Sequence, residues 1–125
     1  METLTIEMTP KTPLIHFNAG DGVLEFQGRS IPENSIEFYA PVFDWMDKYS
    51  VNPRKETSVK IQLEYFNTSS SKCLLDIFKK LQNLHKDGTS KVTVTWFYEE
   101  DDEDMLEAGE DYQAIIKVPF VMSKI

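Results

Sequence analysis

The sequence predicts a single-domain α/β sandwich in which helices pack on a mixed β-sheet. Residues 57–66 and 91–98 alternate apolar and polar side chains as β-strands do, and the segments after them carry apolar residues at helical spacing. A hairpin signal precedes both strands. Strands that alternate with helices need crossover connections, so a hairpin followed by a largely parallel βαβαβ half gives a mixed sheet. We therefore expect one domain over residues 1–125.

The N-terminal third predicts a hairpin and then a helix. Extended stretches at residues 13–18 and 23–27 flank a short connection whose glycines and Asp suit a tight turn, Ala19-Gly20-Asp21-Gly22. Residues 32–50 then place apolar side chains at helical spacing. Pro41 lacks a backbone N–H, so we expect it to start a new helical segment or to kink a longer helix. Residues 51–55 form a connection.

The central strand is expected to bury one face. Its alternation puts Val59, Ile61, Leu63 and Tyr65 on the buried face, with Lys60, Gln62, Glu64 and Phe66 on the other. A helix follows and closes at Gly88, and residues 91–98 form the next strand. The pattern then predicts a short helix around residues 102–108, a stop at Gly109 and a last strand over residues 115–121, with Pro119 suited to a sheet edge.

The net charge of −8 arises from one segment. Residues 99–111 hold nine of the 21 acidic residues and no Lys or Arg, so the rest of the chain has a balance of +1. No comparable basic stripe exists, which argues against nucleic acid or an anionic membrane surface as a partner. A basic protein surface fits the acidic segment better.

The sequence offers little to support an enzyme or a secreted protein. The N-terminus has no signal-peptide pattern and no apolar run is long enough to insert into a membrane, so we expect a cytoplasmic protein. His16 and His85 lack companion motifs, Cys73 lies in a helical pattern that favours burial, and phosphate-loop, dinucleotide and zinc motifs are absent. We expect no catalytic residues, no metal and no cofactor.

The acidic run from Glu99 to Asp104 leaves an alternative open. Several carboxylates could hold Mg²⁺ or Ca²⁺, which would make the chain a metal-dependent domain, although the spacing does not match a calcium-binding loop. A solvated helix start explains most of these acids, because Asp and Glu complement the helix dipole. Their density also suits a recognition surface.

A strand pattern runs directly into four hydroxyl residues, Thr68, Ser69, Ser70 and Ser71, and then into a helix. The first amides of a helix have no intrahelical acceptor, so this place can cap the helix or hold a phosphate. Spacing alone does not rank the four, although Thr68 is the natural N-cap or first helical residue. If the strands at 57–66 and 91–98 run parallel, Thr68 and the acidic run share one edge of the sheet.

Three motifs carry a resemblance to a known family: IPENSIEFYAPVFDW, LEYFNTSSSKCLLDI and WFYEEDDEDMLEAGEDY. Over roughly residues 10–120 the chain resembles the SiaC-type regulatory phosphoproteins of bacteria. The resemblance implies that Thr68 is phosphorylated by a dedicated Ser/Thr kinase and dephosphorylated by a metal-dependent Ser/Thr phosphatase. It also implies that the unphosphorylated form binds and activates a diguanylate cyclase, and so promotes cyclic-di-GMP synthesis, biofilm formation and aggregation.

The element order is also similar to that of STAS-type anti-sigma-factor antagonists, which leaves open a protein that binds a kinase and no cyclase. For the leading interpretation, we expect Thr68 as the phosphorylation site. We expect four residues around the phosphate: Asn67, Ser69, Ser70 and Lys72. Five acidic residues are expected to contact the partner: Glu99, Glu100, Asp101, Asp102 and Asp104.

Overall fold

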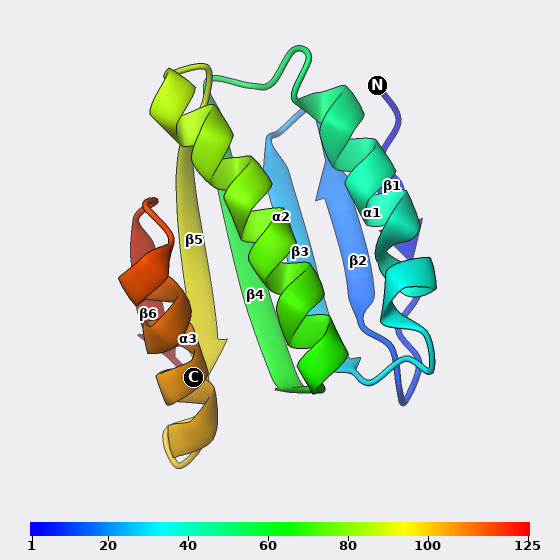
Figure 1. Cartoon of the computed structure of the whole chain (residues 1–125), viewed down its shortest axis with the longest axis vertical. Coiled ribbons are helices and arrows are strands. Elements are labelled where there is room, and N and C mark those ends of the chain that lie inside the picture. The colour runs from blue at the N-terminus through cyan, green and yellow to red at the C-terminus, as the bar shows by residue number, and fades with distance from the viewer.

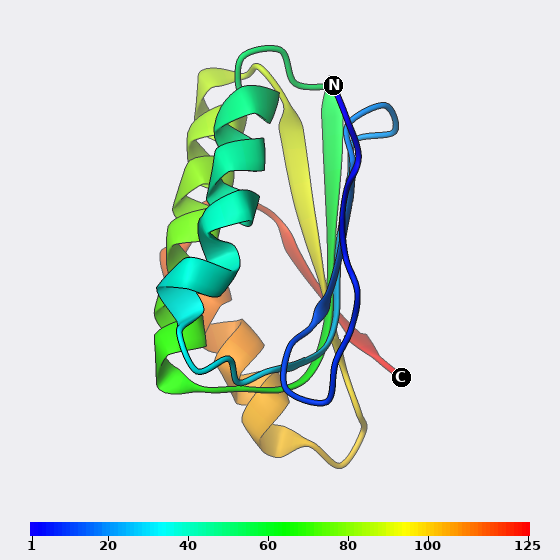
Figure 2. The ribbon, with the colours of Figure 1, turned by 90° about the vertical axis from the view of Figure 1, so that its right-hand side faces the viewer.

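Six strands form one sheet, and three helices cover one of its faces (Figures 1 and 2). The computed structural model describes residues 1–125. The strands are β1 (Leu4–Ile6), β2 (Leu14–Asn18), β3 (Val23–Ser30), β4 (Glu56–Phe66), β5 (Lys91–Tyr98) and β6 (Phe120–Lys124). The helices are α1 (Ser35–Tyr49), α2 (Thr68–Asp87) and α3 (Glu103–Ile115). The other face of the sheet carries no helix, as the edge-on view of Figure 2 shows.

The strands lie in the sheet in chain order, from β1 to β6. β1, β2 and β3 pair antiparallel, whereas β3, β4, β5 and β6 pair parallel, so the predicted mixed sheet is confirmed. Each parallel step crosses over through one helix. The crossovers all have the same handedness, and each adds its strand on the same side of the previous one. The three helices therefore lie on one face of the sheet, and the molecule has two layers. None of the helices has both the length and the apolar content that a membrane span requires.

The core lies between the helices and the sheet. Its centre is formed by fully buried residues of α2, such as Ile77 and Phe78, against strand residues such as Ile61 and Trp96. Cys73 is buried as expected, and burial raises the pKa of its thiol. α1 runs without a break through Pro41, so the prediction of a new segment there is wrong. Its start is fixed by Asn34, whose side chain accepts the Glu37 N–H at 3.1 Å.

The C-terminal elements differ from the prediction. Gly109 does not end α3 but lies inside it, where a Cβ atom would stand 2.6 Å from Cδ1 of Trp96. The glycine is needed for close packing of the helix on the indole ring. α3 therefore continues to Ile115, and the last strand begins at Phe120, not at residue 115. The short edge strand β1 was not predicted, because three residues are too few for a periodic pattern.

A β-bulge near the end of β4 corrects a second prediction. Gly28 pairs with Leu63 and Arg29 pairs with Tyr65, so Glu64 is an extra residue in the ladder. The shift reverses the alternation beyond it. Tyr65 is consequently exposed, whereas Phe66 turns to the helix side and packs edge-on against Trp96 at a centroid distance of 6.1 Å.

Candidate functional site

The three helices all begin at the same end of the sheet (Figure 1). β3, β4 and β5 are parallel neighbours, and each leads into the helix that follows it, so Ser35, Thr68 and Glu103 start their helices at the carboxyl end of the parallel strands. We refer to this as the helix-start end. Thr68 and the acidic run after β5 therefore share one edge of the sheet, as expected.

Asn67 caps α2. Its side-chain oxygen accepts the Ser70 N–H at 2.9 Å and the Ser69 hydroxyl at 3.2 Å. Thr68 is accordingly the first helical residue and not the cap. Asn67, and not the Thr68 hydroxyl, accepts a free N–H group at the start of the helix. Of the two roles predicted for the hydroxyl run, capping therefore does not fall to Thr68.

Ser70 is the most deeply buried of the four consecutive hydroxyl residues. Its hydroxyl donates to the Ser30 carbonyl at 3.0 Å and accepts from the Ser30 hydroxyl at 2.8 Å. The Ser30 hydroxyl also lies 2.6 Å from the hydroxyl of Tyr39, and burial raises the pKa of Tyr39 to about 12. A buried chain of three hydroxyls, those of Tyr39, Ser30 and Ser70, thus joins α1, β3 and α2.

Two further contacts engage the remaining serines. The hydroxyls of Ser69 and Ser35 lie 2.6 Å apart, which ties α2 to the first turn of α1. The hydroxyls of Ser71 and Tyr112 lie 3.0 Å apart, and the Tyr112 hydroxyl lies 2.8 Å from the Ser71 carbonyl, to which it can donate. Burial raises the pKa of the Tyr112 hydroxyl. The first turn of α2 is therefore bonded to both neighbouring helices.

Thr68 differs from the three serines. Its side chain is exposed and makes no hydrogen bond with the rest of the chain, whereas each serine hydroxyl has a partner. The N–H groups of Thr68 and Ser69 have no intrahelical acceptor, since they belong to the first turn. Lys72 is exposed one turn further along α2, at the spacing that brings side chains together on a helix face. Ser69 is exposed as well, but its hydroxyl is hydrogen-bonded, so Thr68 is the only one of the four that is both exposed and free of hydrogen bonds.

Sequence reasoning missed the hydrogen-bond partners of the three serines, namely Ser30, Ser35 and Tyr112, and also Tyr39, which bonds to Ser30. A signal for one of them was present. Ser30 follows Leu24 and Phe26 at the inward positions of β3, so a polar residue there required a buried partner. The contacts of Ser35 and Tyr112 span more than 30 residues and left no local pattern.

The acidic run is partly structural. Asp102 caps α3 by accepting the Met105 N–H at 3.0 Å, and Asp104 lies in the first turn, where it complements the helix dipole. Glu100 forms an exposed ion pair with Lys124 at 3.5 Å. No three His, Cys, Asp or Glu side chains come together in a way that could hold a metal ion, so the metal-binding interpretation gains no geometric support.

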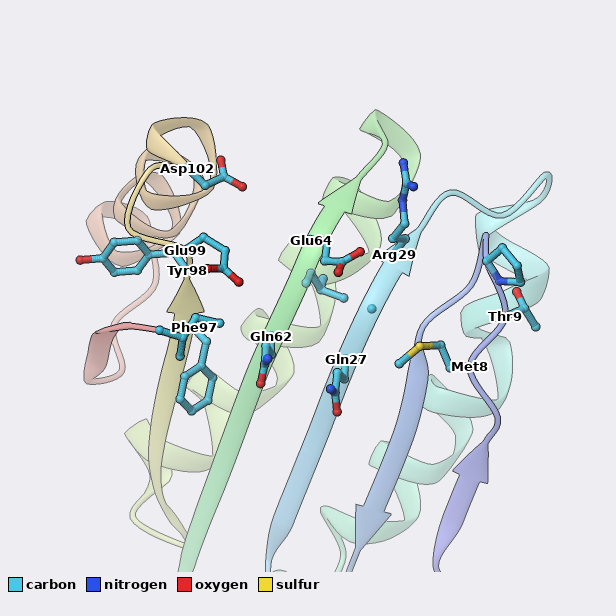
Figure 3. Close-up of a pocket in the computed structure, with 14 residues that line it drawn as sticks. Met8, Thr9, Gln27, Arg29, Gln62, Glu64, Phe97, Tyr98, Glu99 and Asp102 are labelled. Carbon is cyan, nitrogen blue, oxygen red and sulfur yellow. The ribbon is translucent and has the colours of Figure 1, made fainter.

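A groove of about 380 Å³ lies on the helix-free face of the sheet, at the same end (Figure 3). Glu64 and Arg29 come from adjacent strands, and Glu99 and Asp102 extend toward the groove from the segment after β5. The acidic run thus contacts both layers of the molecule, since Asp102 lines the groove on one face of the sheet and caps α3 on the other.

Comparison with known proteins decides the family. The family model described as SiaC family regulatory phosphoprotein matches residues 6–125. The chain belongs to the SiaC family. The family expected from the three sequence motifs is therefore confirmed, and the match covers every element of the fold except the first residues of β1.

Relatives of this SiaC family member include proteins of Pseudomonas aeruginosa. An uncharacterized protein of strain UCBPP-PA14 is 33% identical over 122 residues, which cover 98% of this chain and 96% of that protein. Apo-SiaC from P. aeruginosa is 32% identical with a TM-score of 0.90, over 98% of this chain and 99% of its own. A crystal structure of the diguanylate cyclase SiaD in complex with its activator SiaC contains a chain that is 32% identical, with a TM-score of 0.92 and the same coverage.

Proposed function

We propose that this protein is a non-enzymatic switch that binds and activates a diguanylate cyclase while Thr68 is unphosphorylated. The observation that carries the proposal is that Thr68 is the one accessible, unbonded hydroxyl among four at the start of α2. The likeness to SiaC, which is the activator of SiaD in P. aeruginosa, supports a cyclase as the partner. The family description as regulatory phosphoproteins supports control by phosphate.

The position of Thr68 explains how a phosphate could act. A phosphothreonine adds a charge of roughly −1.5 to −2 and three acceptor oxygens. The free amides of the helix start and Lys72 favour that charge, so the phosphate would be held in place. The same end of the sheet already carries the acidic run. A partner that docks there would have to accommodate additional bulk and bury a highly charged group, which is costly without a matching cation.

Two enzymes complete the switch. A dedicated Ser/Thr kinase would place the phosphate on Thr68, and a metal-dependent Ser/Thr phosphatase would remove it. Both would act in the cytoplasm, where the cyclase would find its activator in the dephosphorylated form. The protein itself then needs no catalytic residue, because its output is the activity of the partner.

The test compares wild type, Thr68→Ala and Thr68→Asp for binding to the diguanylate cyclase of the same cells and for activation of cyclic-di-GMP synthesis. Thr68→Ala should bind like wild type, and Thr68→Asp should bind more weakly. Asn83→Asp is the matched control, because it adds one charge to an exposed position near the other end of α2. Equal affinity of all four proteins would overturn the proposal. Co-purification with a kinase and no cyclase would support an antagonist of the anti-sigma type instead.

A further inference from the structure

The groove on the helix-free face carries charges that the chain itself does not pair. Glu64, from β4, and Glu99, from the segment after β5, both line the groove and are exposed (Figure 3). Arg29 lines the same groove but forms an ion pair with neither carboxylate. The three ion pairs of the structure involve no residue of the groove: Lys48–Asp44, Lys80–Asp47 and Lys124–Glu100.

The fold does not use the carboxylates of Glu64 and Glu99. Glu64 is the extra residue of the bulge in β4, and Glu99 follows the end of β5. Neither side chain accepts a hydrogen bond from the rest of the chain. Asp102, the third carboxylate of the groove, differs from them, because it accepts the Met105 N–H at 3.0 Å and caps α3. Glu64 and Glu99 are therefore available to a cation from outside the chain.

Apolar side chains form two walls of the groove. Met8 lies over Gly28, where an added Cβ would stand 3.2 Å from the methionine sulfur, so the glycine lets Met8 approach the sheet. Phe97 faces the groove from β5, since its neighbour Trp96 is buried on the helix side. Lys and Arg pack their alkyl stems on apolar surface while the charged head binds carboxylates, and Arg also stacks on aromatic rings. Carboxylates beside an aromatic wall therefore fit an arginine side chain.

We propose that this groove is a docking site for an arginine-bearing segment of the cyclase, with the guanidinium group between Glu64 and Glu99. The residues that line the groove include three carboxylates and one guanidinium group, so a net charge of −2 complements a basic segment. This inference rests on the proposed function and names a surface through which the partner would bind. Thr68 begins α2 on the other face of the sheet, so a partner that contacts both must extend around the helix-start end.

The experiment measures binding of the purified cyclase to Glu64→Gln and Glu99→Gln by biolayer interferometry. Glutamine keeps the shape of glutamate and removes its charge. Each variant should weaken binding by about tenfold or more, mainly through faster dissociation, because the ion pair would be enclosed between the two proteins. Glu107→Gln is the matched control, because Glu107 is exposed on α3 outside the groove, and it should change the affinity by less than about twofold. Unfolding midpoints are measured in parallel to verify that each variant is folded.

Arg29→Gln tests the sign of the charge that the groove binds. Arg29 is the only cation that lines the groove, so it would repel a basic segment. Its replacement should leave binding at least as tight as in wild type. A disturbed groove shape would instead weaken binding in the Arg29 and glutamate variants alike. Weaker binding of Arg29→Gln would therefore overturn the assignment of a basic occupant.

The outcomes separate this inference from the proposed function. If Thr68→Asp weakens binding while Glu64→Gln and Glu99→Gln bind like wild type, the docking groove is refuted and the switch stands. If both glutamine variants weaken binding while Thr68→Asp binds like wild type, the docking groove stands and the switch fails. If wild type binds no cyclase, both are overturned.

Discussion

Replacing Asn67 by alanine should destabilise the protein, whereas replacing Thr68 by alanine should not. Asn67 supplies the only side-chain oxygen that accepts the Ser70 N–H, at 2.9 Å, and Ser70 is fully buried. The alanine variant would leave that amide without a partner at a position poorly accessible to water. Thr68, by contrast, is exposed and makes no hydrogen bond through its side chain.

The magnitude follows from the helix cap. Loss of an asparagine N-cap costs about 0.5–2 kcal/mol, and the burial of Ser70 places the expected loss near 1.5 kcal/mol. For a chain of 125 residues, the average entropy of unfolding converts this loss into a decrease of about 6 °C in Tm. Thr68→Ala should change the free energy of unfolding by less than about 0.5 kcal/mol, or about 2 °C.

Thermal unfolding followed by tryptophan fluorescence is a suitable assay, because Trp45 and Trp96 are both buried. Asn67→Asp is the matched control: its carboxylate can accept the same N–H, so it should retain most of the stability. If Thr68→Ala loses as much stability as Asn67→Ala, or if Asn67→Ala loses none, the assignment of the cap is wrong. The separation matters for function, since a switch residue that also capped its helix would couple signalling to unfolding.

Three further predictions concern packing, pH and phosphate. Gly109→Ala should lower the urea midpoint of unfolding, because the added Cβ would lie 2.6 Å from Trp96. The overpacking costs about 1–3 kcal/mol, which exceeds or matches the gain in helix propensity of about 1 kcal/mol. The free energy of unfolding should fall between pH 10 and 12, because a tyrosine in the unfolded chain loses its proton near pH 10.0, whereas the pKa of folded Tyr39 is about 12. Urea titrations of Tyr39→Phe over the same pH range should show a smaller decrease. Phosphorylation of Thr68 should raise Tm by an amount equivalent to about 0.3–1 kcal/mol, and less in Lys72→Ala; a lower Tm would contradict this reasoning.

The regular elements of the fold could be predicted because their periodicity is local. The strand predicted at residues 57–66 differs from β4 by one residue at its start. The helix predicted to close at Gly88 corresponds to α2, which ends at Asp87 with Gly88 as its C-cap. Gly109 was misread because a glycine suggests a helix end, whereas here it allows α3 to approach Trp96. The bulge at Glu64 was missed because it depends on how β4 pairs with β3 near Gly28. Gly28 lies 36 residues before Glu64 in the chain, so no local pattern reveals the pairing.

The site could be predicted only in part. The strand, the hydroxyl run and the following helix were evident from spacing, but the choice of Thr68 among four hydroxyls came from the family resemblance. The structure supplies an independent physical ranking through Ser30, Ser35 and Tyr112, which engage the serines. These contacts join different helices and strands, so no local pattern could have revealed them. The assignment of partner contacts to the acidic run stays a prediction.

The order of the strands has a consequence for how the protein is made. Because each strand lies beside the strand that precedes it in the chain, every pairing in the sheet forms between consecutive strands, with one helix between the two strands of each parallel pair. Each strand therefore pairs with a strand that has already been made, although parallel partners such as Val59 and Val94 are 35 residues apart in the chain. During synthesis the sheet can therefore grow one strand at a time from β2 to β6, with each helix closing over the strands already in place. The helix-start end is built by three successive units of the same kind, and it is complete once α3 has left the ribosome.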